Sequence, residues 1–367
     1  MQIAIAHDYL TQRGGAERVV LMLSRMFPDA PIYTSLYDPD GTYPEFAELD
    51  IRTSHLNRVP FFRKHHRAAL PLLPFAISSM KIDAELVIVS SSGWAHGMRT
   101  RGIKLAYTYA PARWLYEGDR YLGDSTRWIR LGLNILRPAL IWWDRRAHRT
   151  VDKHIAISSL TRDKLKSQYG VEAPILGAPH RYGLDDSRKI SEHNPAGPRG
   201  YFLTVSRLLP YKNVDVIVDA FRYLTNERLV IVGSGPESER LKETAPDNVK
   251  FLENLLDSEV SACYSGAKAL IAASYEDFGL TPLEAAVFGV PSIVLREGGF
   301  LDTVSTRSGL FFDEPTSDSV RTAVERFDAM QFDPEEIESL ASRFTADAFS
   351  ARLMAIIHET TRGGNSI

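Results

Sequence analysis

Short apolar runs alternate with helix-like segments along this chain, and this alternation constrains its fold more than any other feature. In the first half the runs lie at residues 3–10, 31–36, 85–91, 104–110 and 153–158. In the second half they lie at residues 201–208, 228–235, 249–254, 268–274 and 291–297. Because the pattern is typical of parallel sheets covered by helices, we predict an α/β protein with parallel sheets.

Helical spacing of apolar residues occurs between these runs. It is found at residues 16–27, 213–224, 237–245, 258–266, 281–289 and 335–361. The pair Ser158-Ser159 is expected to cap a further helix that begins near Leu160.

The chain is long enough for two domains, since 367 residues is about twice the usual domain size. The polar stretch from Asp185 to Gly200 contains two prolines and two glycines, which is typical of a linker. We therefore predict a first domain over residues 1–184, a linker over 185–200, a second domain over 201–345, and a final helix and tail over 346–367.

Composition excludes several classes of protein. Lys and Arg number 43 against 46 Asp and Glu, so no overall positive charge favours nucleic acid and none is expected as a partner. The single cysteine, Cys263, cannot form an internal disulfide and is expected to be a core residue. No apolar run approaches the roughly 20 residues of a membrane span, and the N-terminus lacks the basic region of a signal peptide. We therefore expect a cytoplasmic protein, either free or peripheral at the inner face of the cell membrane.

The most informative motif runs from Glu276 to Glu284, after the run at 268–274. A loop containing Gly279 leads to a helix that is expected to begin at Pro282. The free N–H groups of such a helix start could hold a diphosphate, with a carboxylate on either side. Alternatively, Thr281 and Glu284 form a capping box, in which Glu284 has only a structural role.

A second motif brackets a proline-constrained turn with two cations, Arg207 and Lys212. The two side chains could converge on one anion, to which arginine presents a fork and lysine a point charge. The alternative is that both are solvated loop residues.

Glycines follow two other predicted strands. Gly14 and Gly15 permit close approach of the backbone to a ligand and a tight turn into the following helix. Gly233 lies in a Gly-Ser-Gly-Pro stretch that could lie beside a nucleotide. In both places a plain turn is an equally good interpretation.

Taken in order, the stretches GGAER, SRLLPYKN, VGSGPE and EDFGLTPLE resemble those of the retaining glycosyltransferase family 4. The stretches SSSGWAHG, YTYAPARWLYE and VDKHIAIS are similar to those of its mannosyltransferase-like members, which build bacterial polysaccharides. This family has the GT-B fold. The resemblance therefore implies two facing Rossmann-like domains, an acceptor-binding one and a nucleotide-sugar-binding one, and a C-terminal helix that crosses back to the first domain.

The resemblance also implies roles for individual residues. Arg207 and Lys212 match the pair that binds the donor diphosphate and stabilises it as it leaves, and both are counted as catalytic with Glu276. Glu276 matches the first glutamate of the motif, near the transferred sugar, and Glu284 the second, which accepts hydrogen bonds from the ribose. The other residues implied to bind the donor are Gly14, Gly15, Tyr109, Gly233, Phe278, Gly279 and Leu280.

One position departs from the family. Related sequences have His-Thr-Pro where this chain has Tyr109-Ala110-Pro111, and that histidine often contacts the donor sugar. The phenol of Tyr109 could still hydrogen-bond a hydroxyl. His96, at the end of a different predicted strand, is another source of an imidazole.

The implied reaction transfers a hexose, with mannose expected first, to a saccharide or polyprenyl-diphosphate-linked acceptor. The expected donor is GDP-mannose, or second a UDP-sugar, and neither a cofactor nor a metal is expected. Two alternatives remain open at this stage: a non-catalytic nucleotide-sugar-binding partner of another transferase, and a sugar-nucleotide epimerase of the same fold.

Residues 51–82 contain no acidic residue and combine arginines and lysines with aromatic and aliphatic side chains. Such a composition suits contact with an anionic membrane surface or a lipid diphosphate. The alternative is a core helix and loop with a solvated basic face.

Overall fold

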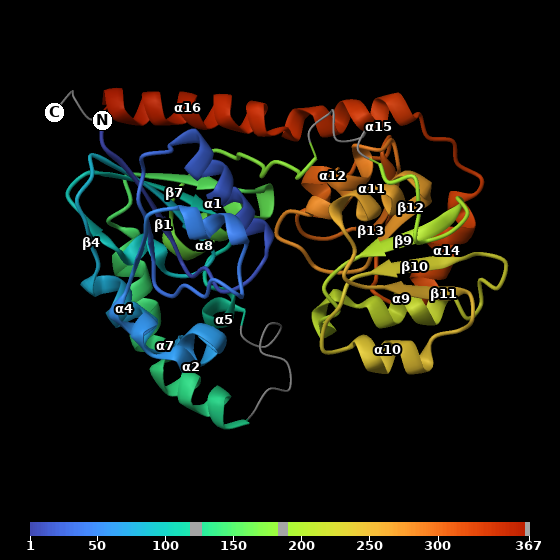
Figure 1. Ribbon diagram of the computed structural model, residues 1–367, viewed down its shortest axis with the longest axis horizontal. Coiled ribbons are helices and arrows are strands. Elements are labelled where there is room, and N and C mark those ends of the chain that lie inside the picture. The colour runs from blue at the N-terminus through green and yellow to red at the C-terminus, as the bar shows by residue number, and fades with distance from the viewer. Residues whose placement is uncertain (118–126, 183–189, 364–367) are drawn as a thin grey trace. The chain divides into compact units, whose positions relative to one another are not determined.

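The computed structural model describes residues 1–117, 127–182 and 190–363 (Figure 1). The chain folds into two compact units. One unit comprises Met1–Gly177 and Ser350–Ile367, and the other comprises Ala178–Phe349.

The first unit is built on a six-stranded parallel sheet in the order β3-β2-β1-β5-β7-β8, accompanied by a two-stranded sheet of β4 and β6. The strands are β1 (Ile3–His7), β2 (Ile32–Thr34), β3 (Ile51–Thr53), β4 (Lys81–Ile82), β5 (Leu86–Ser91), β6 (Arg99–Thr100), β7 (Ile103–Thr108) and β8 (Lys153–Ala156). The α-helices described in this unit are α1 (Gly15–Met26), α2 (Pro60–Lys64), α3 (His66–Ala69), α4 (Leu73–Ser79), α5 (Arg113–Tyr116), α7 (Arg127–His148) and α8 (Ser159–Tyr169).

The second unit repeats this plan with a parallel sheet in the order β11-β10-β9-β12-β13-β14. Its strands are β9 (Tyr201–Val205), β10 (Leu229–Val232), β11 (Val249–Leu252), β12 (Ala267–Ala272), β13 (Ser292–Leu295) and β14 (Gly309–Phe312). Its α-helices are α9 (Val214–Ala220), α10 (Ser238–Thr244), α11 (Asp257–Gly266), α12 (Leu280–Ala286), α13 (Phe300–Thr303), α14 (Ser317–Phe327) and α15 (Pro334–Ala341). Figure 1 shows these helices on both faces of the sheet.

The prediction of parallel sheets is confirmed, and every apolar run predicted as a strand contains one. Alternate residues of these strands pack on opposite faces of the second sheet. Phe202 and Ile231 belong to one core cluster, whereas Leu203 and Val230 belong to the other. A strand covered on both faces has no polar face, which is why the sequence has continuous apolar runs rather than alternation.

The elements that the sequence missed include the edge strands β3 and β14, the two-residue strands β4 and β6, and the helices α5, α13 and α14. Strand β3 is a three-residue edge strand whose residues are partly or fully exposed, so it has no apolar run. Strand β14 is a buried run of only four residues, which periodicity cannot distinguish from part of a helix.

In both sheets the order of the strands reverses at the first strand. Strand β1 lies between β2 and β5, and β9 lies between β10 and β12. The connections on either side of this reversal lie on opposite faces of the sheet. The loops at the carboxyl ends of the two central strands therefore diverge. Ligands bind open parallel sheets at this switch point.

The segment after the first unit is packed rather than extended. Lys250 donates to the carbonyl of Pro195 over 2.7 Å, and Ala196 is buried in a core cluster of the second unit. Residues 190–200, the described part of the predicted linker, therefore lie against the second unit. The boundary between the two units falls at Gly177 and Ala178.

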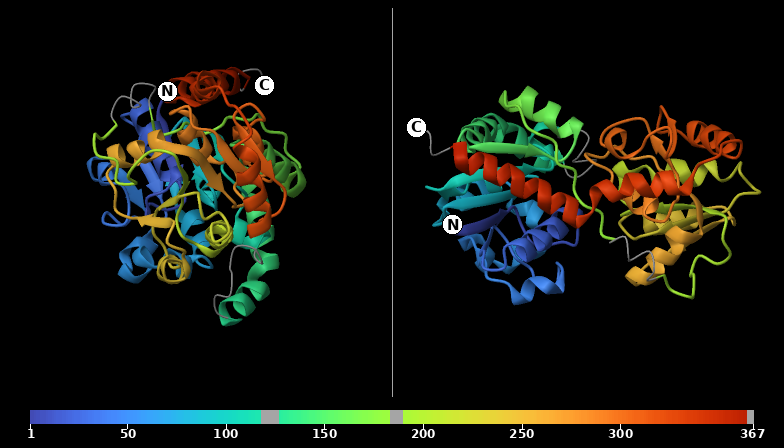
Figure 2. Two further views of the ribbon diagram at one scale, coloured as in Figure 1. Left: turned by 90° about the vertical axis from the view of Figure 1, so that its right-hand side faces the viewer. Right: turned by 90° about the horizontal axis from the view of Figure 1, so that it is seen from above.

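The C-terminal helical pattern is interrupted. It forms α15, a 3-10 turn over Ser342–Phe344, and α16 (Ala346–Gly363). The hydroxyl of Thr345 accepts a hydrogen bond from the backbone N–H of Ala348, as at a helix start. From Ser350 onward the residues belong to the first unit, against which Figure 2 shows the red helix lying. Searched over the described residues, the structure has no helix long and apolar enough to cross a membrane.

A buried polar cluster lies beneath α7. The carboxylate of Asp144 accepts hydrogen bonds from Tyr116 over 2.6 Å and from Tyr169 over 2.7 Å, and it lies 3.2 Å from the imidazole of His96. His96, which the sequence offered as a site imidazole, is therefore buried among structural partners.

Two further histidines complete this cluster. The rings of His148 and His154 stack at 4.8 Å, and the ring of His148 lies 4.2 Å from that of His96. Burial, and then the neighbouring His96, lower the pKa of His154 to about 4, and the same causes hold the pKa of His148 well below its usual value. Both rings are therefore neutral in the folded protein at neutral pH.

Acidification from pH 6.5 to pH 4 should destabilise the protein, because the unfolded chain then binds protons that folded His154 and His148 do not accept. His154→Gln should reduce this loss by up to about 3 kcal/mol. Urea unfolding at several pH values measures it, with the exposed His358 changed to Gln as the control. Equal pH slopes for the wild type and both variants would contradict the prediction.

Candidate active site

The loops that follow β9 and β12 meet at the switch point of the second sheet. The side-chain amide of Asn213 donates to the carbonyl of Ala273 over 2.9 Å, which ties one loop to the other. Lys212 forms an ion pair with Glu276, whose carboxylate also accepts a hydrogen bond of 2.6 Å from the hydroxyl of Ser274. Two charged residues of separate sequence motifs therefore come together where this fold binds ligands.

This ion pair is sheltered but not closed off from solvent. The side chains of Lys212 and Glu276 are 15% and 20% exposed. The ammonium group also lies 5.2 Å above the ring of Tyr211. An ion pair in this position holds both groups in place and leaves them within reach of a ligand, whose anionic groups would compete with Glu276 for the lysine.

Arg207 was predicted to converge with Lys212 on one anion. Lys212 is paired with Glu276, and Arg207 is exposed on the same loop. Within the described ranges, Arg207 forms no ion pair.

Two glycine-containing turns pack against these loops at distances that exclude a side chain. Gly233 has φ of 141°, and a Cβ atom there would lie 1.9 Å from the carbonyl oxygen of Ser206. Gly298 has φ of 67°, and its Cβ would lie 2.4 Å from the carbonyl oxygen of Glu276. The N–H of Gly299 donates to that same oxygen over 2.7 Å. The backbone at Glu276 is therefore fixed by its neighbours.

Helix α12 begins earlier than predicted. Its first residue is Leu280 rather than Pro282, and Gly279 precedes it with φ of 92°. A side chain at Gly279 would also lie 2.6 Å from the ring of Phe300, so only glycine fits this sharp entry. The ring of Phe278 is buried, and its centroid lies 5.8 Å from that of Phe344.

The capping-box interpretation of Glu284 is wrong, because Thr281 lies inside the helix and no side chain caps it. Instead, the carboxylate of Glu284 accepts a hydrogen bond of 2.9 Å from the hydroxyl of Tyr264. Its other oxygen lies 3.3 Å from Nε of Arg181. The side chain of Glu284 is 12% exposed, so it is anchored on one side and reachable on another.

Arg181 is the cationic partner of Glu284. Its guanidinium lies 4.7 Å over the ring of Tyr182 and 3.2 Å from the carboxylate of Asp257. Burial disfavours its charge, but Glu284, with smaller contributions from Tyr182, Tyr264 and Asp257, outweighs that effect, so the pKa of Arg181 is raised. The arginine therefore stays charged and holds Glu284 in a defined orientation.

In the first unit, the glycine pair is at the start of α1, with Gly14 as its N-cap and Gly15 exposed. Tyr109 is buried, and its hydroxyl lies 2.9 Å from that of Ser90 and donates to the carbonyl of Ala16 over 3.3 Å. The phenol thus links the end of β7 to the first turn of α1.

His7 extends this buried network. Its Nδ1 lies 3.1 Å from the hydroxyl of Ser90, and its Nε2 lies 3.9 Å from the buried carboxylate of Glu17. Burial lowers the pKa of His7, but interactions with Glu17, and smaller ones with Asp8 and the backbone of Ser90, together raise the pKa above its usual value. A row of polar groups therefore runs from Tyr109 to Glu17 at the switch point of the first sheet.

Sequence reasoning missed the residues that hold the predicted ones. Ser274 ends a predicted strand two residues before Glu276, so its hydrogen bond to Glu276 had a local signal. Arg181 and Tyr264 had none, because they reach Glu284 from distant parts of the chain. His7 lies at the end of a predicted strand, a position typical of binding residues in parallel sheets.

Comparison with known proteins identifies both halves of the chain. Residues 13–176 match the family model described as Glycosyltransferase Family 4, and residues 185–343 match that described as Glycosyl transferases group 1. The chain is 29% identical over 235 residues to the GDP-mannose-dependent alpha-(1-6)-phosphatidylinositol monomannoside mannosyltransferase of Mycolicibacterium smegmatis, an alignment that covers 56% of this chain and 60% of that protein. It is 31% identical over 158 residues to a glycogen synthase of Granulibacter bethesdensis, covering 38% of this chain and 31% of that one.

Solved structures share the fold over almost the whole chain. Anabaena HepE in complex with UDP has a TM-score of 0.69 at 14% identity. The alignment covers 98% of this chain and 100% of that one. The lipopolysaccharide outer core galactosyltransferase WaaB has a TM-score of 0.64 at 16% identity, with coverage of 99% of that chain and 98% of this one. This likeness shows the GT-B fold. The two family models, which together match residues 13–176 and 185–343, show that the chain belongs to glycosyltransferase family 4.

Proposed function

We propose that this chain is a retaining glycosyltransferase that moves a hexose from a nucleotide diphosphate sugar to an acceptor hydroxyl. The observation that carries the proposal is the pairing of Lys212 with Glu276 at the switch point of the second sheet. The family motif that contains Glu276 also contains Glu284, which is anchored and partly exposed.

Each charged residue has a chemical role in this proposal. Negative charge grows on the diphosphate as the sugar leaves, and Lys212 and Arg207 stabilise it by preorganised electrostatics. Glu276 lies near the transferred sugar. When the donor binds, the ion pair between Lys212 and Glu276 breaks, and Lys212 pairs with the diphosphate. Glu284 accepts hydrogen bonds from the ribose hydroxyls. The departing phosphate takes the proton of the acceptor hydroxyl, so no covalent intermediate on the protein and no metal enter the proposal.

GDP-mannose is our first choice of donor. This choice is supported by the mycobacterial relatives, which are 29% identical to this chain and are named as GDP-mannose-dependent enzymes. The alignments cover 60% and 62% of those relatives, so the donor is a proposal for this chain. A UDP-sugar is the second choice, supported by the UDP bound to a structural neighbour of the same fold.

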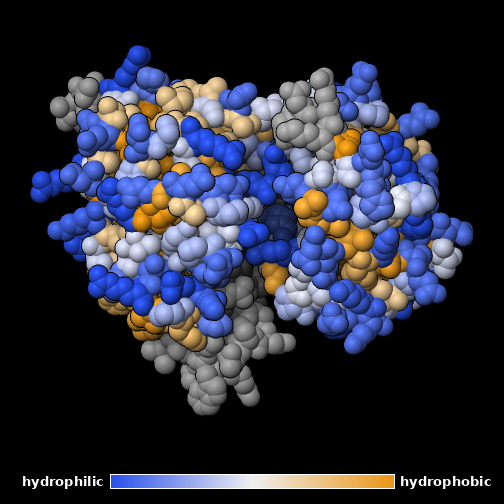
Figure 3. Space-filling view, viewed as in Figure 1, coloured by the Kyte–Doolittle hydropathy of each residue, from blue (hydrophilic) through white to orange (hydrophobic). Residues whose placement is uncertain are grey.

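The proposed acceptor is a saccharide or a polyprenyl-diphosphate-linked sugar at the inner face of the cell membrane. The mycobacterial relatives are named for a lipid acceptor, phosphatidylinositol monomannoside. Residues 51–82 supply a membrane contact in this proposal, because Phe61 and Phe75 are 57% and 74% exposed beside the cations Arg63 and Lys64. Figure 3 shows hydrophobic residues at the lower left, where Figure 1 draws α2 and α4.

The expected outcome of a donor panel is acceptor-dependent release of a nucleoside diphosphate from one nucleotide sugar. The pure protein is incubated with GDP-mannose, UDP-glucose and UDP-galactose, each with and without a polyprenyl-diphosphate-linked saccharide. Tight donor binding without turnover would instead indicate a non-catalytic partner of another transferase. Conversion of the free nucleotide sugar to an isomer would indicate an epimerase.

Lys212→Ala and Glu276→Ala should each reduce turnover at least about tenfold, because each removes one member of the pair at the switch point. The melting temperature should change little, since a partly exposed ion pair contributes little to stability. The matched control is Lys242→Ala, which removes a lysine paired with Glu253 on the edge of the same sheet. A large fall in melting temperature for Lys212→Ala or Glu276→Ala would indicate a structural role instead.

Tyr264→Phe should weaken binding of the nucleoside diphosphate about fivefold, because Glu284 loses the 2.9 Å hydrogen bond that orients its carboxylate. Calorimetric titration with GDP and UDP measures the change. Tyr201→Phe is the control, since it removes an equally buried hydroxyl that donates to the carbonyl of Cys263. Equal affinities for the wild type and both variants would show that Tyr264 does not position Glu284 for the nucleotide.

A further inference from the structure

The C-terminal half of α7 has two faces of opposite character. One face is buried in the first unit and contains Leu140, Asp144 and His148. The other carries exposed arginines, and among them Trp142 is 66% exposed. The helix therefore contributes to the core with one side and presents a cationic and aromatic surface with the other.

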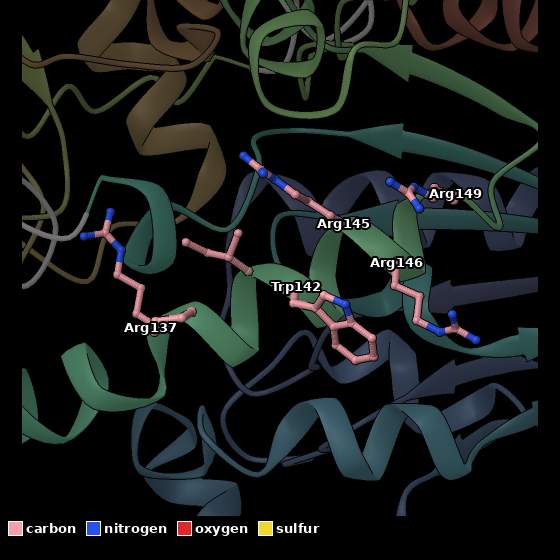
Figure 4. Close-up of a pocket in the computed structure, with 7 residues that line it drawn as sticks. Arg137, Trp142, Arg145, Arg146 and Arg149 are labelled. Atoms are coloured by element: carbon pink, nitrogen blue, oxygen red, sulfur yellow. The ribbon is translucent and has the colours of Figure 1, made fainter.

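This exposed face lines a shallow cavity of about 910 Å³ in the first unit. Figure 4 shows its labelled side chains projecting from successive turns of α7 and, for Arg149, from the residue that follows the helix. The lining residues are Arg137, Pro138, Ile141, Trp142, Arg145, Arg146 and Arg149. The lining includes no acidic residue, and we call this set the α7 basic face.

The charge of the α7 basic face is not balanced locally. Within residues 1–117, 127–182 and 190–363, its arginines form no ion pair. Arg137 donates instead to the carbonyl of Leu115 over 3.0 Å, and Arg146 lies 5.9 Å over the ring of Trp142. The one acidic residue of α7, Asp144, is buried beneath the face and already binds Tyr116 and Tyr169. A chain with net charge −3 thus concentrates positive charge on one helix face.

Helix electrostatics account for only part of this arrangement. Cations in a last turn favour the negative end of the helix dipole, which suits Arg145 and Arg146. That effect ends within one turn, so it does not explain Arg137, and it gives no reason for an exposed Trp142. Arginine beside exposed tryptophan is the composition of surfaces that lie in the headgroup region of a bilayer.

The length of the face also matters. From Arg137 to Arg149 an α-helix rises about 18 Å, which is far longer than one phosphate group. A row of arginines over that distance matches several neighbouring headgroups better than a single bound anion. The half-buried Ile141 and the exposed Leu136 add apolar surface beside Trp142.

We propose that the α7 basic face is a docking surface for an anionic lipid bilayer, in which the arginines bind lipid phosphates and Trp142 enters the interface. The surface lies outside residues 51–82, but it adjoins them, because the indole of Trp143 donates to the hydroxyl of Ser78 in α4 over 3.0 Å. This inference extends the membrane contact of the proposed function and does not depend on the identity of the donor.

Sedimentation with vesicles tests the proposal on the full chain. The vesicles are phosphatidylcholine alone, or equal parts of phosphatidylcholine and phosphatidylglycerol. Binding should require phosphatidylglycerol and weaken with added salt, because salt screens exposed charges. Arg145→Glu with Arg149→Glu should reduce binding to the anionic vesicles at least about tenfold.

A control pair makes the same change of charge elsewhere. Arg326 and Arg352 are exposed, so their double change to Glu should leave vesicle binding within about twofold of the wild type if the position of the charge matters. Trp142→Ala should reduce binding severalfold without changing its dependence on salt. Unchanged melting temperatures show that the variants are folded.

Three outcomes would overturn the proposal. The first is equal loss of binding in both double variants, which would mean that only net charge matters. The second is loss with Phe75→Ala but none with Arg145→Glu and Arg149→Glu, which would assign the contact to residues 51–82 alone. The third is binding of free inorganic phosphate through Arg145 and Arg149 without binding of anionic vesicles. None involves sugar transfer, so failure here is distinguishable from failure of the proposed activity.

Discussion

The reversal of strand order at the first strand of each parallel sheet is the constraint on which the rest of the structure depends. The connections that follow β9 and β12 lie on opposite faces of the sheet. The loops at the carboxyl ends of these strands therefore separate and leave room for a ligand. Lys212 and Glu276 meet in that space only because their strands are neighbours in the sheet, although they are distant in sequence. In the first unit the same geometry brings the end of β1 beside the end of β5, where His7 and Ser90 meet.

The site is made precise by backbone packing rather than by its charged side chains. Gly298 and Gly299 lie against the carbonyl of Glu276, and Gly279 opens α12 against the ring of Phe300. These glycines of the second unit allow neighbouring loops to pack closely against one another. A loop fixed in this way loses little entropy when a ligand binds, and this preorganisation favours electrostatic catalysis.

The carboxylates of Asp144, Glu276 and Glu284 lie in two kinds of surroundings. Asp144 is fully buried and contacts two tyrosines and a histidine, whereas the side chains of Glu276 and Glu284 are 20% and 12% exposed and each has a cationic partner. A buried carboxylate held by two tyrosine hydroxyls supports the fold, and a partly exposed one beside a cation can exchange its partner for a ligand. The same burial of Asp144 leaves the arginines on the opposite face of α7 uncompensated.

The sequence by itself determined the parallel sheets, the helices between them and the positions of the main site motifs, because these depend on local periodicity and turn residues. It placed Lys212 and Glu276 on loops at strand ends, but it did not pair them. It left Glu284 between two roles, and the structure excludes the capping box, because α12 begins before Thr281 and Glu284 contacts Arg181 and Tyr264. Tertiary structure also decided which side of α7 is buried and where His96 lies. These contacts join residues far apart along the chain, and the local patterns from which elements are predicted contain no information about such pairs.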